Sequence, residues 1–354
     1  MRFSFVLLPD YPLDDTIESI KLADALGFYA CYAADETWHK DLWLLFAAAA
    51  DKTENIRFGP SLSPVTLREP SLIAQATATL DELTGGRAEC VLGSGNFGLL
   101  AQYGIDWAGT KPLSRLKEAH HVLRTLLDEG SIDYAGEFFR YRGLFTFARP
   151  VQRHVPVKLG AMRGPKSFQV AGELADGVHH ALSYTRSAYE YMVENVRIGA
   201  ERAGRDMSTL DLGAWVVFAT GPDGRAAKDA ARAMVGLYAS SMSKEQLARN
   251  GVDPASLTDV IAAVGEGRLD RAFELTPPEL ADKLSVAGTP EECADKLRSE
   301  IASTGVNHLI LAITDAALVK SFTGMDLPGV ATMREQLRLV HDHVMPALGD
   351  RPAG

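Results

Sequence analysis

Short apolar runs alternate with amphipathic stretches along almost the whole chain. The first apolar run covers residues 3–8, and in the stretch that follows, 14–26, Ile17, Ile20 and Ala23 recur at helical spacing. The same order of a short apolar run and a helical pattern recurs towards the end of the chain. This alternation predicts βα units around a parallel sheet.

Eight of the apolar runs are predicted to be strands. They lie at residues 3–8, 28–34, 56–61, 88–92, 155–159, 176–181, 210–220 and 307–313. Amphipathic helices are expected at residues 14–26, 41–51, 69–83, 113–129, 166–174, 290–303 and 333–348. Eight strands are the number found in a closed (β/α)8 TIM barrel, which is the predicted fold. The alternative is an open doubly wound sheet, but the Gly-x-Gly-x-x-Gly turn typical of that fold does not follow the first strand.

The domain organisation follows from the same pattern. Residues 222–284 are helical in pattern and show no strand pattern, so they are expected to form an inserted helical segment. Residues 133–140 predict a small hairpin. Because no repeat and no low-complexity linker interrupts the chain, residues 1–350 are predicted to form a single domain, followed by a tail at 351–354.

Composition and charge narrow the class of partner. The 354 residues include 46 acidic and 36 basic side chains, which gives a net charge of -10 and disfavours nucleic acid and anionic membranes as partners. No apolar stretch approaches the ~18 residues of a membrane span. The three cysteines, Cys31, Cys90 and Cys293, form no Cys-x-x-Cys pair. We therefore expect a reduced, cytoplasmic protein that acts on a small molecule.

In such a barrel the functional groups follow the carboxyl ends of the strands. Two of the turns at these positions are rich in glycine. The segment Gly93-Ser94-Gly95-Asn96 allows the backbone to approach a flat ligand closely, although glycines also serve simply to make a bend. The segment 160–166 places Arg163 beside the start of a helix at Gly164 and Pro165, which favours a phosphate site.

Two adjacent carboxylates, Asp35 and Glu36, follow the second predicted strand. Successive residues of an extended chain face opposite sides, so only one of the two is expected to face the barrel mouth. Either is a candidate proton donor or hydrogen-bond acceptor, and capping of the next helix by Asp35 or Asp41 is the alternative interpretation. His179 and His180 also face opposite sides of their strand, and the sequence offers no third ligand nearby, so no metal site is predicted.

Several longer segments resemble the luciferase-like family of flavin- and F420-dependent oxidoreductases. The resemblance is carried by the segments Gly59-Pro60-Ser61-Leu62-Ser63-Pro64, Arg68-Glu69-Pro70, 78–87, 92–95, 160–166, 171–178, 273–277 and 285–293. Within this superfamily the chain is most similar to the methylenetetrahydromethanopterin reductase group. The order of the segments is kept over nearly the whole chain.

The resemblance implies a TIM barrel that binds a flavin or coenzyme F420 at its mouth. It implies a non-prolyl cis peptide at Ser61-Leu62, behind the cofactor ring. Asp35 and Glu36 would flank the ring, and the phosphate would lie at the turn after the fifth strand. The cofactor-binding residues that it implies are Asp35, Ser61, Leu62, Ser63, Gly93, Ser94, Gly95, Asn96, Gly160, Ala161, Met162, Arg163, Gly164, His180 and Ala181.

The expected activity is hydride transfer between C5 of F420 and a small organic substrate, either to a C=C, C=N or carbonyl group or from an alcohol. Glu36 is the first candidate for the acid or base, and Asp35 is the second. An FMN-dependent monooxygenase and a non-catalytic cofactor-binding barrel are the alternatives. Asn96, Glu36, His179 and His180 depart from the residues common in F420-dependent relatives, so the substrate stays open. The resemblance also implies a homodimer or a higher homo-oligomer.

Overall fold

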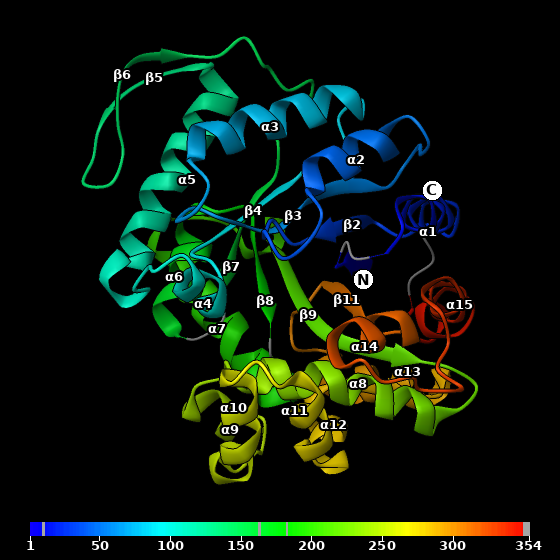
Figure 1. Ribbon diagram of the computed structural model, residues 1–354. Coiled ribbons are helices and arrows are strands. Elements are labelled where there is room, and N and C mark those ends of the chain that lie inside the picture. Colours follow the sequence, from blue (N-terminus) through cyan, green and yellow to red (C-terminus); the bar gives the residue numbers. More distant parts are fainter. Residues whose placement is uncertain (9–10, 162–163, 182, 350–354) are drawn as a thin grey trace.

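The computed structural model describes residues 1–8, 11–161, 164–181 and 183–349. Eight parallel strands close into a barrel with helices around it, so the predicted TIM-barrel fold is confirmed (Figure 1). In their order around the barrel the strands are β1 (Arg2–Leu7), β2 (Ala30–Ala33), β3 (Arg57–Pro64), β4 (Cys90–Gly93), β7 (Val157–Ala161), β8 (Gly177–Ala181), β9 (Asp211–Thr220) and β11 (His308–Ile313).

The outer layer of helices largely follows the prediction. The predicted helices are observed as α1 (Leu13–Ala25), α2 (Leu42–Ala50), α3 (Pro70–Leu83), α5 (Pro112–Glu129), α6 (Pro165–Leu174) and α13 (Pro290–Ile301). The last predicted helix consists of α15 (Met333–Leu339), a π-helical turn (Val340–Val344) and α16 (Met345–Ala347). The pattern did not reveal α4 (Phe97–Gln102), α7 (Arg186–Arg202) and α14 (Ala316–Thr323).

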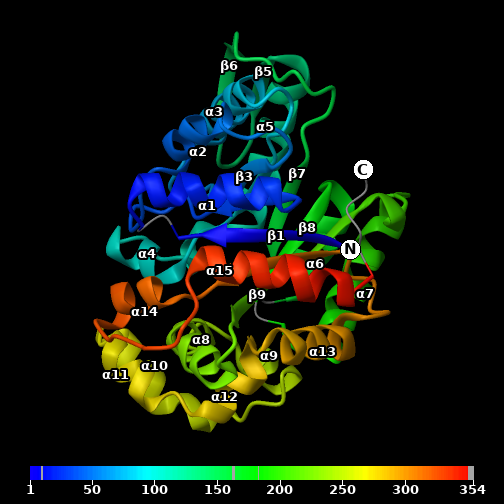
Figure 2. The same cartoon turned by 90° about the vertical axis from the view of Figure 1, so that its right-hand side faces the viewer.

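The segment after β9 is helical, as predicted. It contains α8 (Gly224–Ala239), α9 (Lys244–Arg249), α10 (Thr258–Gly265), α11 (Leu269–Leu275) and α12 (Pro278–Leu284). A short strand that was not predicted, β10 (Val286–Gly288), follows α12 directly and pairs with the end of β9. We refer to α8–α12 as the helical insertion. In Figures 1 and 2 the helical insertion lies at the end of the molecule opposite the hairpin of β5 (Ser131–Ala135) and β6 (Arg140–Phe145).

Short turns of 3-10 helix connect several elements, at Ala108–Thr110, Met207–Thr209 and Pro254–Leu257. Within the described residues, no helix has the length and the apolar character that crossing a membrane requires.

The barrel interior is filled by side chains that stand opposite glycines. A Cβ atom at Gly93 would lie 2.2 Å from Leu62, and one at Gly160 would lie 2.7 Å from it. A Cβ atom at Gly213 would lie 2.9 Å from the ring of His179. Leu62 and His179 therefore occupy the space that these glycines leave free.

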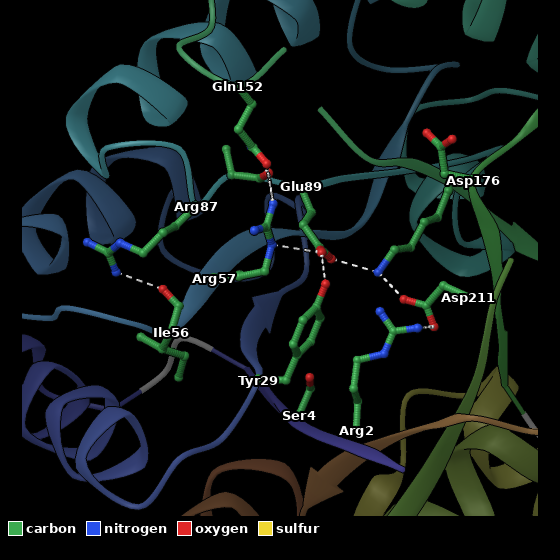
Figure 3. A network of polar contacts seen from close by, with 12 residues as sticks. Arg2, Ser4, Tyr29, Ile56, Arg57, Arg87, Glu89, Gln152, Asp176 and Asp211 are labelled. Carbon is green, nitrogen blue, oxygen red and sulfur yellow. Dashed lines mark hydrogen bonds and ion pairs between the residues drawn. The ribbon is translucent and has the colours of Figure 1, made fainter. Parts of the chain in front are cut away.

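The amino-terminal ends of the strands carry a cluster of buried charges (Figure 3). Lys158 donates to Glu89 at 2.7 Å and forms an ion pair with Asp211. Arg57 donates to Glu89 at 2.9 Å, and Arg2 lies 3.4 Å from Asp211. We call these five residues the basal cluster. Arg2, Arg57 and Asp211 are the first residues of their strands, Glu89 immediately precedes β4, and Lys158 is the second residue of β7. The basal cluster therefore lies at the end of the barrel opposite to the mouth.

Candidate active site

The mouth of the barrel lies where the carboxyl ends of the strands meet. In Figure 2 the arrow of β1 points towards this side, on which α4 and α14 also lie. Asp35 and Glu36 follow β2 here, and Ser61 and Leu62 lie within β3. The structure thus brings side chains from separate βα units to one end of the barrel, as the sequence predicted.

Asp35 is held by two hydrogen-bond donors and one ion pair. The hydroxyl of Ser63 donates to its carboxylate at 2.6 Å, and the indole N–H of Trp43 donates to the same oxygen at 3.3 Å. The guanidinium of Arg68 lies 3.6 Å from the other oxygen and also stacks over the ring of Trp43. These contacts fix the orientation of the Asp35 carboxylate and place a positive charge beside it.

Glu36 has a different environment from its neighbour. Its side chain is half-buried, and it has no hydrogen-bond partner among the residues that the structure describes. Burial, and to a smaller extent the negative charge of Asp35, raise the pKa of Glu36 from 4.5 to about 7. Glu36 therefore has the raised pKa that acid–base chemistry near neutral pH requires.

The cis peptide bond predicted between Ser61 and Leu62 is present. The register between β3 and β4 shifts at this point, between Ser61 and Ser63. The hydroxyl of Ser61 lies 3.2 Å from Nδ1 of His179, and the side chain of Leu62 packs against Gly93 and Gly160. The segment 61–63 therefore contacts three other strands of the barrel.

The turn after β4 is tied to its neighbours. Thr66 donates to the carbonyl oxygen of Ser94 at 2.9 Å, and the indole of Trp107 donates to the Ser94 hydroxyl at 3.4 Å. Gly95 has a positive φ of 99°, which favours glycine. The side chain of Asn96 accepts from the N–H of Gly98 and so caps α4. A role of these residues in cofactor binding stays a prediction.

The expected phosphate site lies at the start of α6. Of its members, Met162 and Arg163 are outside the described residues. Gly164 is the N-cap of α6, no side chain among the described residues caps that helix, and a Cβ atom at Gly164 would meet no such residue within 4 Å. The first N–H groups of α6 are thus available for an anion.

His180 and Ala181 lie at the end of β8 beside this turn. The ring of His180 packs edge-on against Phe168 of α6. One of its nitrogens bonds the carbonyl oxygen of Ala161 at 2.8 Å, and the other bonds the hydroxyl of Ser183. A contact of either nitrogen with a cofactor would displace one of these bonds, so the predicted role of His180 stays a prediction.

The neighbourhood of His179 differs from the sequence-based expectation. His179 lies beside Asp211 and His308, and the three could offer ligand atoms within 4.8 Å of one another. A third potential ligand is therefore present, but it comes from strands far away in the sequence. The basal cluster has three positive and two negative side chains, and its net positive charge disfavours a metal ion.

Sequence reasoning missed four residues of the mouth. They are Trp43, Arg68, Trp215 and Tyr238. Trp43 and Arg68 hold Asp35, and Tyr238 of the helical insertion packs its ring against Trp215 of β9. For Trp43 and Arg68 the available signal was their position after a predicted strand. Trp215 lies in the middle of a predicted strand, and Tyr238 lies far from any predicted strand.

Comparisons with known proteins agree with this architecture. Residues 1–308 match the family model described as luciferase-like monooxygenase. The 5,10-methylenetetrahydromethanopterin reductase of Archaeoglobus fulgidus is 29% identical over 319 residues, covering 88% of this chain and 92% of that protein. A putative coenzyme F420-dependent oxidoreductase of Mycobacterium tuberculosis is 27% identical over 344 residues, with coverages of 89% and 95%.

Two solved structures are similar over nearly their full length. The coenzyme F420-dependent tetrahydromethanopterin reductase of Methanopyrus kandleri superposes with a TM-score of 0.86 at 24% identity, covering 98% of each chain. The oxygenating constituent of 3,6-diketocamphane monooxygenase from Pseudomonas putida, in complex with FMN, has a TM-score of 0.68 at 17% identity, again covering 98% of each chain.

The fold and the site define a TIM-barrel enzyme with a pair of carboxyl groups at its mouth. The chain belongs to the luciferase-like monooxygenase family, whose model matches 308 of its 354 residues. It is an oxidoreductase, as are the relatives that match over nearly its full length.

Proposed function

We propose that this protein is a coenzyme F420-dependent oxidoreductase that transfers a hydride between the deazaflavin and a small organic substrate. The observation that carries the proposal is Glu36, a carboxyl group at the mouth without a hydrogen-bond partner among the described residues and with a pKa raised to about 7. The names of the relatives support F420, and an FMN-bound structure of the same fold supports a flavin as the alternative.

The described residues fit a cofactor with a flat ring and an anionic tail. The uncapped start of α6 offers N–H groups to the tail, and Gly164 adds no side chain in the way. Leu62 follows the cis peptide bond at the register shift of β3, and it is a candidate to pack against the face of the cofactor ring. Ser61, Ser63, Gly93, Ser94, Gly95, Asn96, Gly160, Ala161 and Ala181 remain the further candidates for cofactor contacts.

The chemistry divides between the cofactor and the protein. When bound, the deazaflavin would supply or accept the hydride at its C5 atom. Glu36, which is close to half protonated near pH 7, would give a proton to a substrate that is being reduced. It would take a proton from a substrate that is being oxidised. Asp35, fixed by Ser63 and Arg68, would accept a hydrogen bond and orient the ring.

Titration of the purified protein with F420 and with FMN tests this function. We expect F420 to bind, with a change in its fluorescence, and reduced F420 to be reoxidised without oxygen when a substrate is added. Binding of FMN alone, with substrate turnover only in the presence of oxygen, would support the monooxygenase instead. Tight binding of F420 without turnover on any substrate would indicate a non-catalytic barrel.

A further inference from the structure

The ring of His179 lies inside the barrel, in the middle of β8. Its Nδ1 atom is 3.2 Å from the hydroxyl oxygen of Ser61 at the mouth. The rings of Tyr32 and His308 meet it edge-on, with their centroids 4.8 and 5.7 Å away. On a further side, a Cβ atom at Gly213 would lie 2.9 Å from Cδ2 of His179. These contacts hold the imidazole in one orientation.

The second ring nitrogen of His179 is left over. Nε2 is buried, and it has no hydrogen-bond partner among the residues that the structure describes. Burial first, and the charge of Lys158 next, lower the pKa of His179 well below 6.5, so the ring is neutral at pH 7. A neutral imidazole carries one hydrogen, which makes one nitrogen a donor and the other an acceptor. The position of this hydrogen decides how His179 bonds Ser61.

The side chains below the ring, towards the basal cluster, have already used their donors. The hydroxyl of Tyr32 donates to Glu89 at 2.6 Å. Nδ1 of His308 lies 3.0 Å from the carboxylate of Asp211, to which it donates. The three N–H groups of Lys158 match its three contacts, with Glu89, Asp211 and the oxygen of Tyr32. None of these groups has a hydrogen left for an unprotonated Nε2.

Asp211, by contrast, can accept a further hydrogen. An ionised carboxylate has about four lone-pair sites, and Asp211 receives three donors, from Lys158, Arg2 and His308. A ring nitrogen of His179 and a carboxylate oxygen of Asp211 lie within 4.8 Å of each other. A hydrogen on Nε2 is attracted by this negative charge, whereas a bare lone pair there finds no donor. These surroundings therefore favour the tautomer with its hydrogen on Nε2.

We propose that His179 is a positioning residue that takes up the hydroxyl hydrogen of Ser61 and leaves the Ser61 oxygen as a pure acceptor at the mouth. With its hydrogen on Nε2, His179 accepts at Nδ1, and Ser61 is the donor of that bond. A hydroxyl has one hydrogen and two lone pairs, so only lone pairs remain for a ligand. The cofactor or substrate group that contacts Ser61 is then an N–H or O–H donor. This inference rests on the function proposed above and specifies the polar character of the same site.

NMR of the protein without cofactor tests the tautomer. The histidines are labelled with 15N, and His179→Asn identifies the two ring resonances of His179 by their loss. We expect the hydrogen to stay on Nε2 between about pH 5.5 and 8.5. The Nδ1 resonance should shift in Ser61→Ala, which removes the donor. A hydrogen on Nδ1, or ionisation of the ring within this range, would overturn the inference.

Substitutions of His179 separate the roles of its two nitrogens. In His179→Asn the amide oxygen takes the place of Nδ1 and accepts from Ser61. In His179→Gln the amide reaches the place of Nε2 instead, and His179→Leu has no polar atom. We expect the Gln and Leu variants to bind one ligand about 10-fold more weakly, and His179→Asn to keep most of the wild-type affinity.

The same variants identify which ligand donates to Ser61. A raised dissociation constant for F420 assigns the donor to the cofactor, and a raised KM with unchanged F420 affinity assigns it to the substrate. Either result supports the inference. Wild-type values of both in His179→Leu, or an equal loss in all three variants, would overturn it.

A double variant shows whether His179 acts through Ser61. We expect Ser61→Ala to weaken the same ligand by a similar factor, and His179→Leu to add no further loss in the Ser61→Ala background. Losses that add, or a Ser61→Ala variant with wild-type affinity and KM, would overturn the inference. Failure of the wild-type protein to bind F420 would instead refute the proposed function, and the NMR result would still decide the tautomer.

Discussion

At the scale of single residues, the adjacent carboxyl groups Asp35 and Glu36 differ in their partners rather than in their chemistry. Asp35 accepts from Ser63 and Trp43 and lies beside Arg68, whereas among the described residues Glu36 has only the charge of Asp35 next to it. Glu36 was the first candidate from the sequence and Asp35 the second. The sequence could not show why their environments differ, because the donors to Asp35 come from positions that show no motif.

Replacement of Glu36 by Gln tests its role as the acid. The amide cannot supply a proton, so we expect kcat in the direction of substrate reduction to fall by at least about 100-fold. F420 affinity, measured by fluorescence titration, should change little because Glu36 holds no described group in place. Equal losses in turnover and in affinity would argue that Glu36 binds the cofactor instead.

The pH profile follows from the raised pKa of Glu36. In the direction of reduction the carboxyl must be protonated, so kcat should be constant below about pH 7 and fall above it. In the direction of oxidation the profile should be reversed. Asp35→Asn removes the like charge and should move both profiles to lower pH, whereas a shift to higher pH would contradict this explanation.

At the scale of elements, the start of α6 is the best-defined candidate for the anionic tail. Gly164→Asp places a carboxylate at the N-cap, where aspartate stabilises a helix but competes with an anion for its N–H groups. We expect F420 to bind at least about 10-fold more weakly while the protein remains folded. Gly164→Ala is the matched control, because its Cβ atom meets no described residue within 4 Å and should leave affinity unchanged.

The elements also show how far a periodic pattern predicts structure. The eight barrel strands were found because each is an apolar run next to a helical pattern. The short strand β10 was missed because three residues carry no period, and α7 was missed because its buried face includes Asn195, Gly199 and Ala200. Gly199 lies where α7 contacts the backbone of α6, and a side chain there would clash: a Cβ atom at Gly199 would lie 1.9 Å from the carbonyl oxygen of Gln169.

At the scale of the whole molecule, the basal cluster connects the amino-terminal ends of five strands through ion pairs. It was not predicted. The charged residues Glu89 and Lys158, in or next to apolar runs, were the signal. Asp211, which pairs with Lys158, lies more than fifty residues further along the chain. A buried ion pair of this kind can only be recognised once the barrel has closed.

The basal cluster makes the free energy of unfolding depend on pH in the acidic range. Burial raises the pKa of Glu89, but Lys158 and Arg57 outweigh it and lower that pKa from 4.5 to about 2. Because this pKa is lower in the folded protein than in the unfolded chain, ionised Glu89 stabilises the fold above about pH 4.5. The stabilisation is lost as the pH falls from about 4.5 towards 2, in total on the order of 3 kcal/mol. Urea unfolding at several pH values should show this loss.

The Glu89→Gln variant isolates this contribution. It leaves Lys158 with one carboxylate fewer in a buried place, so we expect the free energy of unfolding at pH 7 to fall by about 3–5 kcal/mol and the acid dependence to weaken. Glu194→Gln, at an exposed ion pair with Arg197, should change the free energy of unfolding far less, because solvent screens this pair. Similar losses in the two variants would show that the cluster adds no special stability.

The assembly of the molecule was predicted from resemblance alone, as a homodimer or a higher homo-oligomer. Large apolar side chains are exposed on neighbouring helices, Leu44 of α2 at 74% and Leu72 of α3 at 52%. We expect light scattering to give the mass of a dimer, and the double variant Leu44→Asp and Leu72→Asp to give a monomer that still folds. A monomeric wild-type protein would refute the homodimer.

The central claim is that Glu36 is a carboxyl group that gains and loses its proton near neutral pH. Infrared difference spectroscopy across a pH titration measures this directly, through the C=O stretch of a protonated carboxyl group. The wild-type protein should show such a band with a midpoint about 7, and the band should be absent in Glu36→Gln and have a lower midpoint in Asp35→Asn. A band that persists in Glu36→Gln, or no carboxyl titration near neutrality, would contradict the account.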